Sequence, residues 1–194
     1  MIFNMLKNFN WLDIGILIII FRVLYIAIKN GFTTEFFKFL GVICAVYLSM
    51  HYNGAVADFI RARLPVEEKM PLEFLDFLVF LILAIAGNFV FVLLRNVVNN
   101  LIKIEAVSTL NKWGGLLLGA LRSVLLVSLI LFALVISSIP YLKNSVKDSY
   151  LGPKVFSTAV NTYSWIWNNV FSKFAPLEKQ NSTVLEAEEE IISK

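Results

Sequence analysis

Five polar residues lie inside or at the edges of long apolar stretches, where a charge is costly and a polar group marks a candidate site. They are Arg22, Glu35, Lys38, Asn88 and Arg122. When the apolar stretches are taken as helices of alternating direction, all five fall within roughly 14 Å of the same membrane boundary. Glu35 is the one acidic residue at that depth. We expect it to pair with Arg122, because a guanidinium can engage a carboxylate through two hydrogen bonds.

Three interpretations of this polar layer stay open. The charged side chains can reach the lipid headgroups independently of one another. They can instead form ion pairs that only hold the helices together. The third interpretation is a net positive vestibule that binds an anionic headgroup, a small anion or a protein partner.

Catalytic chemistry has little support in the sequence. Cys44 is the single cysteine and His51 the single histidine. An internal disulfide, Cys/His metal sites and most nucleophile–base pairs are therefore excluded. The sequence also has no GxSxG, HExxH or glycine-rich phosphate loop. We expect a protein that is not an enzyme and that holds no cofactor or metal.

Four apolar blocks must position the polar layer. Of the 194 residues, 58% are hydrophobic and 16% are charged, whereas soluble domains are nearer a half and a quarter. The blocks cover residues 11–28, 32–50, 74–94 and 113–139, and each is long enough to cross a bilayer core. Asn30-Gly31 is a turn signal between the first two. The predicted fold is all-α: a polytopic membrane protein with an antiparallel bundle of four transmembrane helices.

Small residues recur at four-residue spacing on two of the blocks. They are Gly41 and Ala45 on the second block, and Gly115, Gly119 and Ser123 on the fourth. Small residues at this spacing let helix backbones approach closely inside a bilayer. We expect these stripes to pack within the bundle, with homo-oligomerisation as the alternative.

The chain after the fourth block has a different character. Residues 151–175 have the spacing of an amphipathic helix, with Phe156, Tyr163, Trp167 and Phe171 on its apolar face. Such a helix lies in the membrane interface or packs across the ends of the bundle. Residues 176–194 are rich in glutamate, and we expect a mobile acidic tail. The predicted organisation is a four-span membrane domain over 1–150, an interfacial helix over 151–175 and the tail over 176–194.

The distribution of positive charge predicts an orientation. The net charge is +3, but the basic residues stand singly between apolar blocks, which argues against nucleic acid as a partner. In a four-span topology, eight lysines and arginines before residue 175 lie on the side of both termini and four on the other. The positive-inside rule then places both termini in the cytoplasm. The expected partners are the lipid bilayer and other membrane proteins.

Four short motifs resemble the colicin V production protein (CvpA) family of bacterial inner-membrane proteins. The motifs occupy residues 10–13 (NWLD), 29–35 (KNGFTTE), 110–122 (LNKWGGLLLGALR) and 149–153 (SYLGP). Asn30 stands where the family usually has arginine, and Asn111-Lys112 where it commonly has Asp-Arg. The resemblance covers about residues 10–172. It implies a bacterial inner-membrane protein associated with toxin production or export and with envelope homeostasis.

Two functions are compatible with these observations. The first is a non-enzymatic accessory or scaffold protein that supports production or export of a colicin V-like toxin. The second is a small transporter or channel in which a Glu35/Arg122 layer handles an anion or proton. Four spans leave only a narrow interior, and the sequence has no Pro-broken helices or inverted repeat. We therefore favour the scaffold.

Overall fold

The computed structural model describes residues 9–63, 71–101, 108–137, 139–175 and 178–192, and all the regular structure in these ranges is helical. The elements are α2 (Trp11–Arg61), α3 (Leu72–Leu101), α4 (Ser108–Ile136), α5 (Pro140–Asp148), α6 (Gly152–Ile166), the π-helix η1 (Trp167–Phe171), α7 (Ser172–Phe174) and α8 (Ser182–Ile192). The all-α prediction is confirmed for the described residues. Among them, three helices are long and apolar enough to cross a membrane: α2, α3 and α4.

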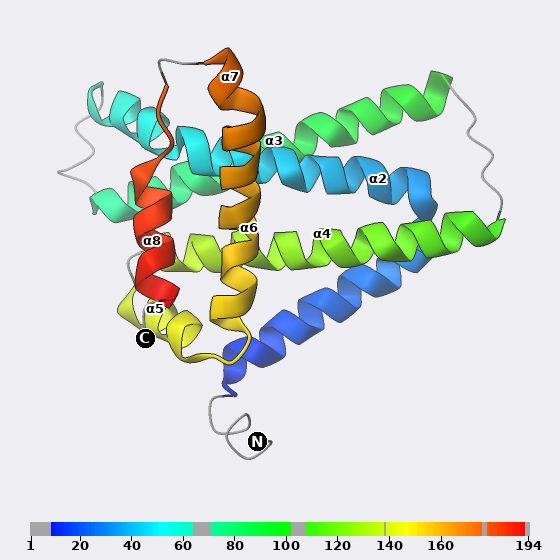
Figure 1. The fold of residues 1–194 in the computed structure, drawn as a ribbon, viewed down its shortest axis with the longest axis horizontal. Coiled ribbons are helices and arrows are strands. Elements are labelled where there is room, and N and C mark those ends of the chain that lie inside the picture. The colour runs from blue at the N-terminus through cyan, green and yellow to red at the C-terminus, as the bar shows by residue number, and fades with distance from the viewer. Residues whose placement is uncertain (1–8, 64–70, 102–107, 138, 176–177, 193–194) are drawn as a thin grey trace.

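The first two apolar blocks lie in two helical arms that meet at a sharp kink and together make up α2. Gly31 has φ 76° and ψ 174°, a conformation outside the helical region that glycine adopts readily. The bend divides α2 into a first arm, residues 11–30, and a second arm, residues 32–61. Figure 1 shows the chain turning back on itself at this point. The turn predicted at Asn30-Gly31 is therefore a kink without a loop, and α2 runs on past residue 50, where the second apolar block ends.

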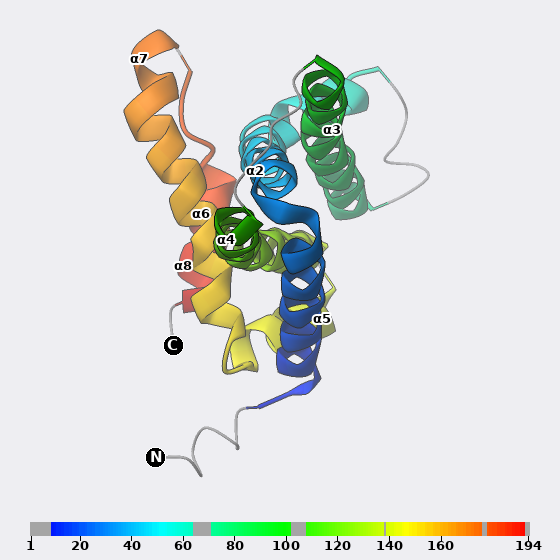
Figure 2. The same ribbon diagram turned by 90° about the vertical axis from the view of Figure 1, so that its right-hand side faces the viewer.

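Helix α4 lies at the centre of the molecule. It packs against both α2 and α6, whereas α3 packs mainly against α2 and touches α4 much less. Figure 2 shows α4 between α6 on one side and α2 on the other. Its C-terminal half supplies much of the core, including Val127, Leu131 and Phe132, each at most 2% exposed.

Helix α6 crosses α4 in the C-terminal half of α4 (Figure 1). The Ser128 hydroxyl donates a hydrogen bond of 2.6 Å to the Phe156 carbonyl and accepts one of 2.8 Å from the Ala159 N–H. Phe132 and Phe156 stack beside this contact, with ring centroids 5.7 Å apart. A serine hydroxyl buried between two helices is stable only with such partners. The structure therefore shows α6 packed against the side of α4.

The aromatic residues predicted to form an interfacial face are covered by the rest of the chain. Phe156, Tyr163 and Trp167 are buried, and the half-buried Phe171 stacks on Tyr47 with ring centroids 4.0 Å apart. Their apolar surface is thus used for contacts inside the protein. The described geometry does not present these four side chains to lipid.

The expectation of a mobile tail is wrong for most of residues 176–194. Ser182–Ile192 forms α8, which packs against α6 and α5. Val184 and Ile191 are 2% and 1% exposed, and Lys143 on α5 forms an ion pair of 2.6 Å with Glu190. The glutamates obscure an apolar stripe at helical spacing, Val184, Ala187 and Ile191, that is sufficient to dock the helix.

Candidate functional site

The kink in α2 forms a corner into which α4 fits. A Cβ on Gly115 would lie 2.9 Å from the Gly31 carbonyl carbon, and one on Gly119 would overlap the Cβ of Ala27. Glycine is therefore required at both positions for α4 to approach this closely. The first two residues of the stripe predicted on the fourth block, Gly115 and Gly119, pack against the first arm of α2 near the kink.

The stripe on the second block packs against a different helix. A Cβ on Gly41 would lie 2.6 Å from Asn88 Oδ1, and one on Gly87 would lie 2.7 Å from Ala45 Cα, so this stripe meets α3. Ser123, the third member of the other stripe, is fully buried and donates a hydrogen bond of 2.7 Å to the Ala120 carbonyl. The two stripes therefore do not meet each other. The glycines of α4 pack against the first arm near the kink, whereas the stripe on the second arm packs against α3.

Glu35 occupies the inside of the corner and is fully buried. Its Oε2 accepts from both Nε and Nη2 of Arg122, each at 2.8 Å. Its Oε1 accepts from Asn30 Nδ2 at 2.6 Å and from Lys38 Nζ at 3.4 Å. The pair expected between Glu35 and Arg122 is present. Both oxygens of the carboxylate are satisfied, as a buried charge requires.

Asn111 completes the corner from the start of α4. Its Oδ1 accepts a hydrogen bond of 2.6 Å from the Phe32 N–H. This N–H follows directly after the non-helical Gly31, and Asn111 gives it a partner. A Cβ on Gly31 would lie 2.5 Å from the same oxygen, so the asparagine and the glycine fit each other closely. Sequence reasoning treated Asn111 only as a departure from the family pattern.

Positive charge exceeds negative charge around Glu35. Lys38 lies within electrostatic range of Arg122 and Arg95 as well as Glu35. We call Glu35, Lys38, Arg95 and Arg122 the Glu35 cluster. It holds three cations and one carboxylate, a net formal charge of about +2 at neutral pH. Arg95 was missed as a site residue, although it follows Asn88 by seven residues and so lies on the same helix face.

Within the described residues, the two remaining predicted members of the polar layer form no hydrogen bond or ion pair with this cluster. Arg22 is exposed on the first arm and forms no ion pair within the described ranges. Asn88 is half-buried against Gly41. The predicted layer of five is thus a cluster around Glu35, with Arg22 and Asn88 outside it.

A second buried carboxylate, Asp13, lies at the opposite end of the first arm. Its Oδ1 accepts from the Leu151 N–H at 2.8 Å, and its Oδ2 from the N–H groups of Tyr150 at 3.2 Å and Asn10 at 2.9 Å. The Asn10 side chain also caps α2 and donates 2.8 Å to the Ser145 carbonyl. Asp13 thereby fastens the start of α2 to the chain between α5 and α6.

His51 joins the second arm to the C-terminal segment. Its Nδ1 is 3.1 Å from the Tyr163 hydroxyl and its Nε2 is 3.0 Å from Glu178 Oε2. The Tyr163 oxygen accepts from the Asn181 N–H at 2.9 Å, so its own hydrogen is available for Nδ1. Burial raises the pKa of Tyr163 above its usual range, although the hydrogen bond from Asn181 lowers it. The imidazole also stacks on Trp167 in the π-helix, with centroids 4.9 Å apart.

These three sites differ in the chemistry open to them. In the described part of the chain, no group of three His, Cys, Asp or Glu side chains could hold a metal ion. The Asp13 and His51 sites connect elements of the protein to one another. The Glu35 cluster alone combines buried charge with surplus positive charge, which makes it the candidate functional site.

Residues 12–160 match the family model described as Colicin V production protein. No curated protein and no solved structure matches the chain. The matched range contains Asp13, the whole Glu35 cluster and the Tyr150-Leu151 segment, and it ends before Tyr163 and α8.

Proposed function

Because the chain belongs to the colicin V production protein family, we propose that it is a non-enzymatic accessory protein of the bacterial inner membrane that supports production or export of a colicin V-like toxin. Membership ties the chain to colicin V production. The accessory role, export and envelope homeostasis are our proposal. Three long apolar helices fit a multi-pass membrane protein.

We further propose a four-crossing arrangement in which the two arms of α2 cross separately. At about 1.5 Å per residue, the first arm is roughly 30 Å long, which is the thickness of the hydrocarbon core. The second arm, α3 and α4 supply the other crossings, and both termini lie in the cytoplasm. The division into a membrane domain over 1–150 and an added helix over 151–175 follows from this arrangement. In it, α6 packs on the flank of the membrane domain.

The observation that carries the scaffold proposal is that the polar layer ends in a packed apolar core. Beyond Arg122 along α4, the inward side chains Leu125, Leu129 and Phe132 are at most 6% exposed. A route for ions needs polar groups or water along its whole length. Past Glu35, the buried polar side chains of the described residues include single serines, Ser49 and Ser128, whose hydroxyls are used in hydrogen bonds to backbone carbonyls. They do not form a continuous polar path, which supports a packed protein that holds surfaces in place.

The first experiment tests accessory function in a toxin-producing strain that lacks its own family member. We expect the wild-type chain to restore toxin release. A photo-crosslinking residue at Ile82, which is 65% exposed on α3, should trap proteins of the toxin export machinery. The same residue at Phe80, one of the buried positions of α3, is the matched control. Failure of the wild-type chain to restore release would contradict the accessory role. Restored release without a crosslink specific to Ile82 would show that the exposed side of α3 does not contact that machinery.

A second candidate, anion or proton transport, is favoured by one observation, the net positive charge of the Glu35 cluster. It is tested with purified protein in liposomes loaded with a pH dye or an anion-sensitive dye. The scaffold proposal expects no flux above empty liposomes. Flux that disappears in Glu35→Gln, but not in Arg22→Gln, would overturn the scaffold in favour of transport.

A further inference from the structure

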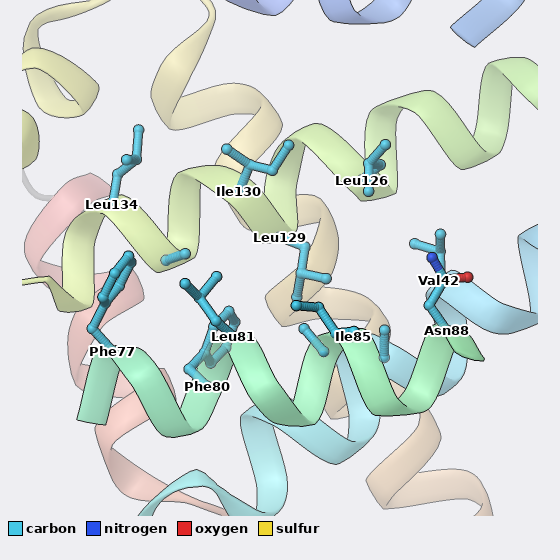
Figure 3. A pocket seen from close by; sticks show the side chains of 13 residues that line it. Val42, Phe77, Phe80, Leu81, Ile85, Asn88, Leu126, Leu129, Ile130 and Leu134 are labelled. Carbon is cyan, nitrogen blue, oxygen red and sulfur yellow. The ribbon is translucent and has the colours of Figure 1, made fainter. Parts of the chain in front are cut away.

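An apolar groove runs between α3 and α4. It forms because the two helices pack against α2 more than against each other. Val42 and Ala45 form its floor, and its cavity measures about 350 Å³. This volume is at the lower end of the range of ligand sites, about 300–1,000 Å³. Figure 3 shows the two walls, with Phe77 and Leu134 at one end and Asn88 at the other.

All three helices place a cation at the Asn88 end of the groove. On α2, Lys38 comes four residues before Val42, and on α4, Arg122 comes four residues before Leu126. On α3, Arg95 comes seven residues after Asn88. Residues at these spacings share one helix face. The apolar walls therefore continue into a positive rim, which is the cationic part of the Glu35 cluster.

The rim retains unused capacity to bind an anion. Within the described ranges, Nε of Arg95 is buried and has no hydrogen-bond partner. The hydrogen bond of Lys38 to Glu35 is long, at 3.4 Å. The Lys38 side chain is 25% exposed and that of Arg122 is 11% exposed. A phosphate that approaches along the groove can thus reach donors that Glu35 leaves free.

We propose that this groove binds an anionic phospholipid, with an acyl chain along the apolar walls and the phosphate at Lys38, Arg95 and Arg122. The charge at one end and the apolar surface along the rest match the two parts of such a lipid. Basic pockets between transmembrane helices bind anionic headgroups in the same way. A free phosphate would use the rim but not the groove. The site is independent of the accessory role proposed above.

The test is native mass spectrometry of the purified full chain with phosphatidylglycerol or phosphatidylcholine of equal chain length. We expect phosphatidylglycerol to be retained at least about fivefold more, since each cation near a lipid headgroup contributes about 1 kcal/mol. The double variant Lys38→Gln/Arg95→Gln should bind both lipids equally. Arg22→Gln removes a cation outside the rim and should leave the preference intact. Equal retention by the wild type, or the same loss in Arg22→Gln, would overturn the headgroup site.

A second pair of variants tests the groove itself. Ala84→Leu fills the groove wall and should lower retention of both lipids, whereas Ala86→Leu changes an exposed residue of the same helix and should not. Glycerol phosphate distinguishes the two sources of phosphate. If it displaces phosphatidylglycerol at equal concentration, or if Ala84→Leu has no effect, the acyl-chain assignment is wrong. A variant is compared with the wild type only if it melts at the same temperature, which shows that it is folded. If the double variant Lys38→Gln/Arg95→Gln melts lower, the single variant Arg95→Gln takes its place.

Discussion

Asp13 and Glu35 are both fully buried carboxylates, but they are stabilised in opposite ways. Asp13 accepts only backbone N–H groups and has no ion pair in the described structure. Glu35 accepts only side-chain donors, two of which are cations. The neutral N–H groups around Asp13 hold the carboxylate in place without adding positive charge. The three cations around Glu35 carry more positive charge than its single carboxylate neutralises. The arrangement at Asp13 is typical of a structural contact between elements, and the arrangement at Glu35 is typical of a ligand-binding site.

The largest expected effect is at Glu35. Glu35→Gln keeps the shape of the side chain but leaves Arg122 and Lys38 buried without a counter-charge. We expect a loss of about 3–5 kcal/mol in the free energy of unfolding, measured in detergent micelles. The double variant Glu35→Gln/Arg122→Gln should recover part of that loss, because it removes one of the stranded charges. A loss below about 1 kcal/mol would mean that Glu35 does not hold the corner together.

A smaller effect is expected from the matched change at Asp13. Asp13→Asn keeps one acceptor oxygen for the three N–H groups and strands no cation. We expect a loss of about 1–3 kcal/mol in the same unfolding measurement. If Asp13→Asn costs as much as Glu35→Gln, the distinction between the two carboxylates is wrong.

The smallest effect is expected at Glu188, a half-buried carboxylate on α8. Burial raises its pKa, although a hydrogen bond from Ser157 lowers it. An acid with a raised folded-state pKa favours folding most below its unfolded pKa, and this contribution is lost as the pH rises through the folded pKa. Glu188→Gln should therefore stabilise the protein at pH 7, by less than about 1 kcal/mol given the screening by water, and not at pH 4.

Thermal melting at the two pH values checks this expectation. Glu189→Gln, on the exposed side of α8, is the matched control and should melt like the wild type at both. A gain at pH 4 as large as at pH 7 would show that ionisation of Glu188 does not oppose the docking of α8.

The sequence predicts the Glu35 pair because it offers one acid among several cations at one depth. It does not reveal Asn30 and Asn111 as partners, since their roles exist only once Gly31 has bent the helix. The donors to Asp13 are equally hidden. Two of the three are backbone groups 137 and 138 residues away, and any residue type but proline supplies such a group.

The C-terminal elements show why composition misleads. In α8, glutamates outnumber the apolar residues that dock the helix, so an average over the segment resembles a solvated tail. In α6, the amphipathic pattern correctly predicts a helix. It cannot tell whether the apolar face meets lipid or protein, because both are equally apolar.

The kink at Gly31 also sets an order of events during synthesis. The α2 helix carries Glu35 together with Asn30 and Lys38, so the acid leaves the ribosome with two of its partners in the same helix. Arg122 is 87 residues further along, and at about 5–20 residues per second it follows roughly 4–17 seconds later. During that interval the corner has no α4 to close it, and the nascent chain must keep a half-satisfied carboxylate out of the bilayer core. Asn30 and Lys38 thus provide hydrogen bonds to Glu35 until α4 has been synthesised.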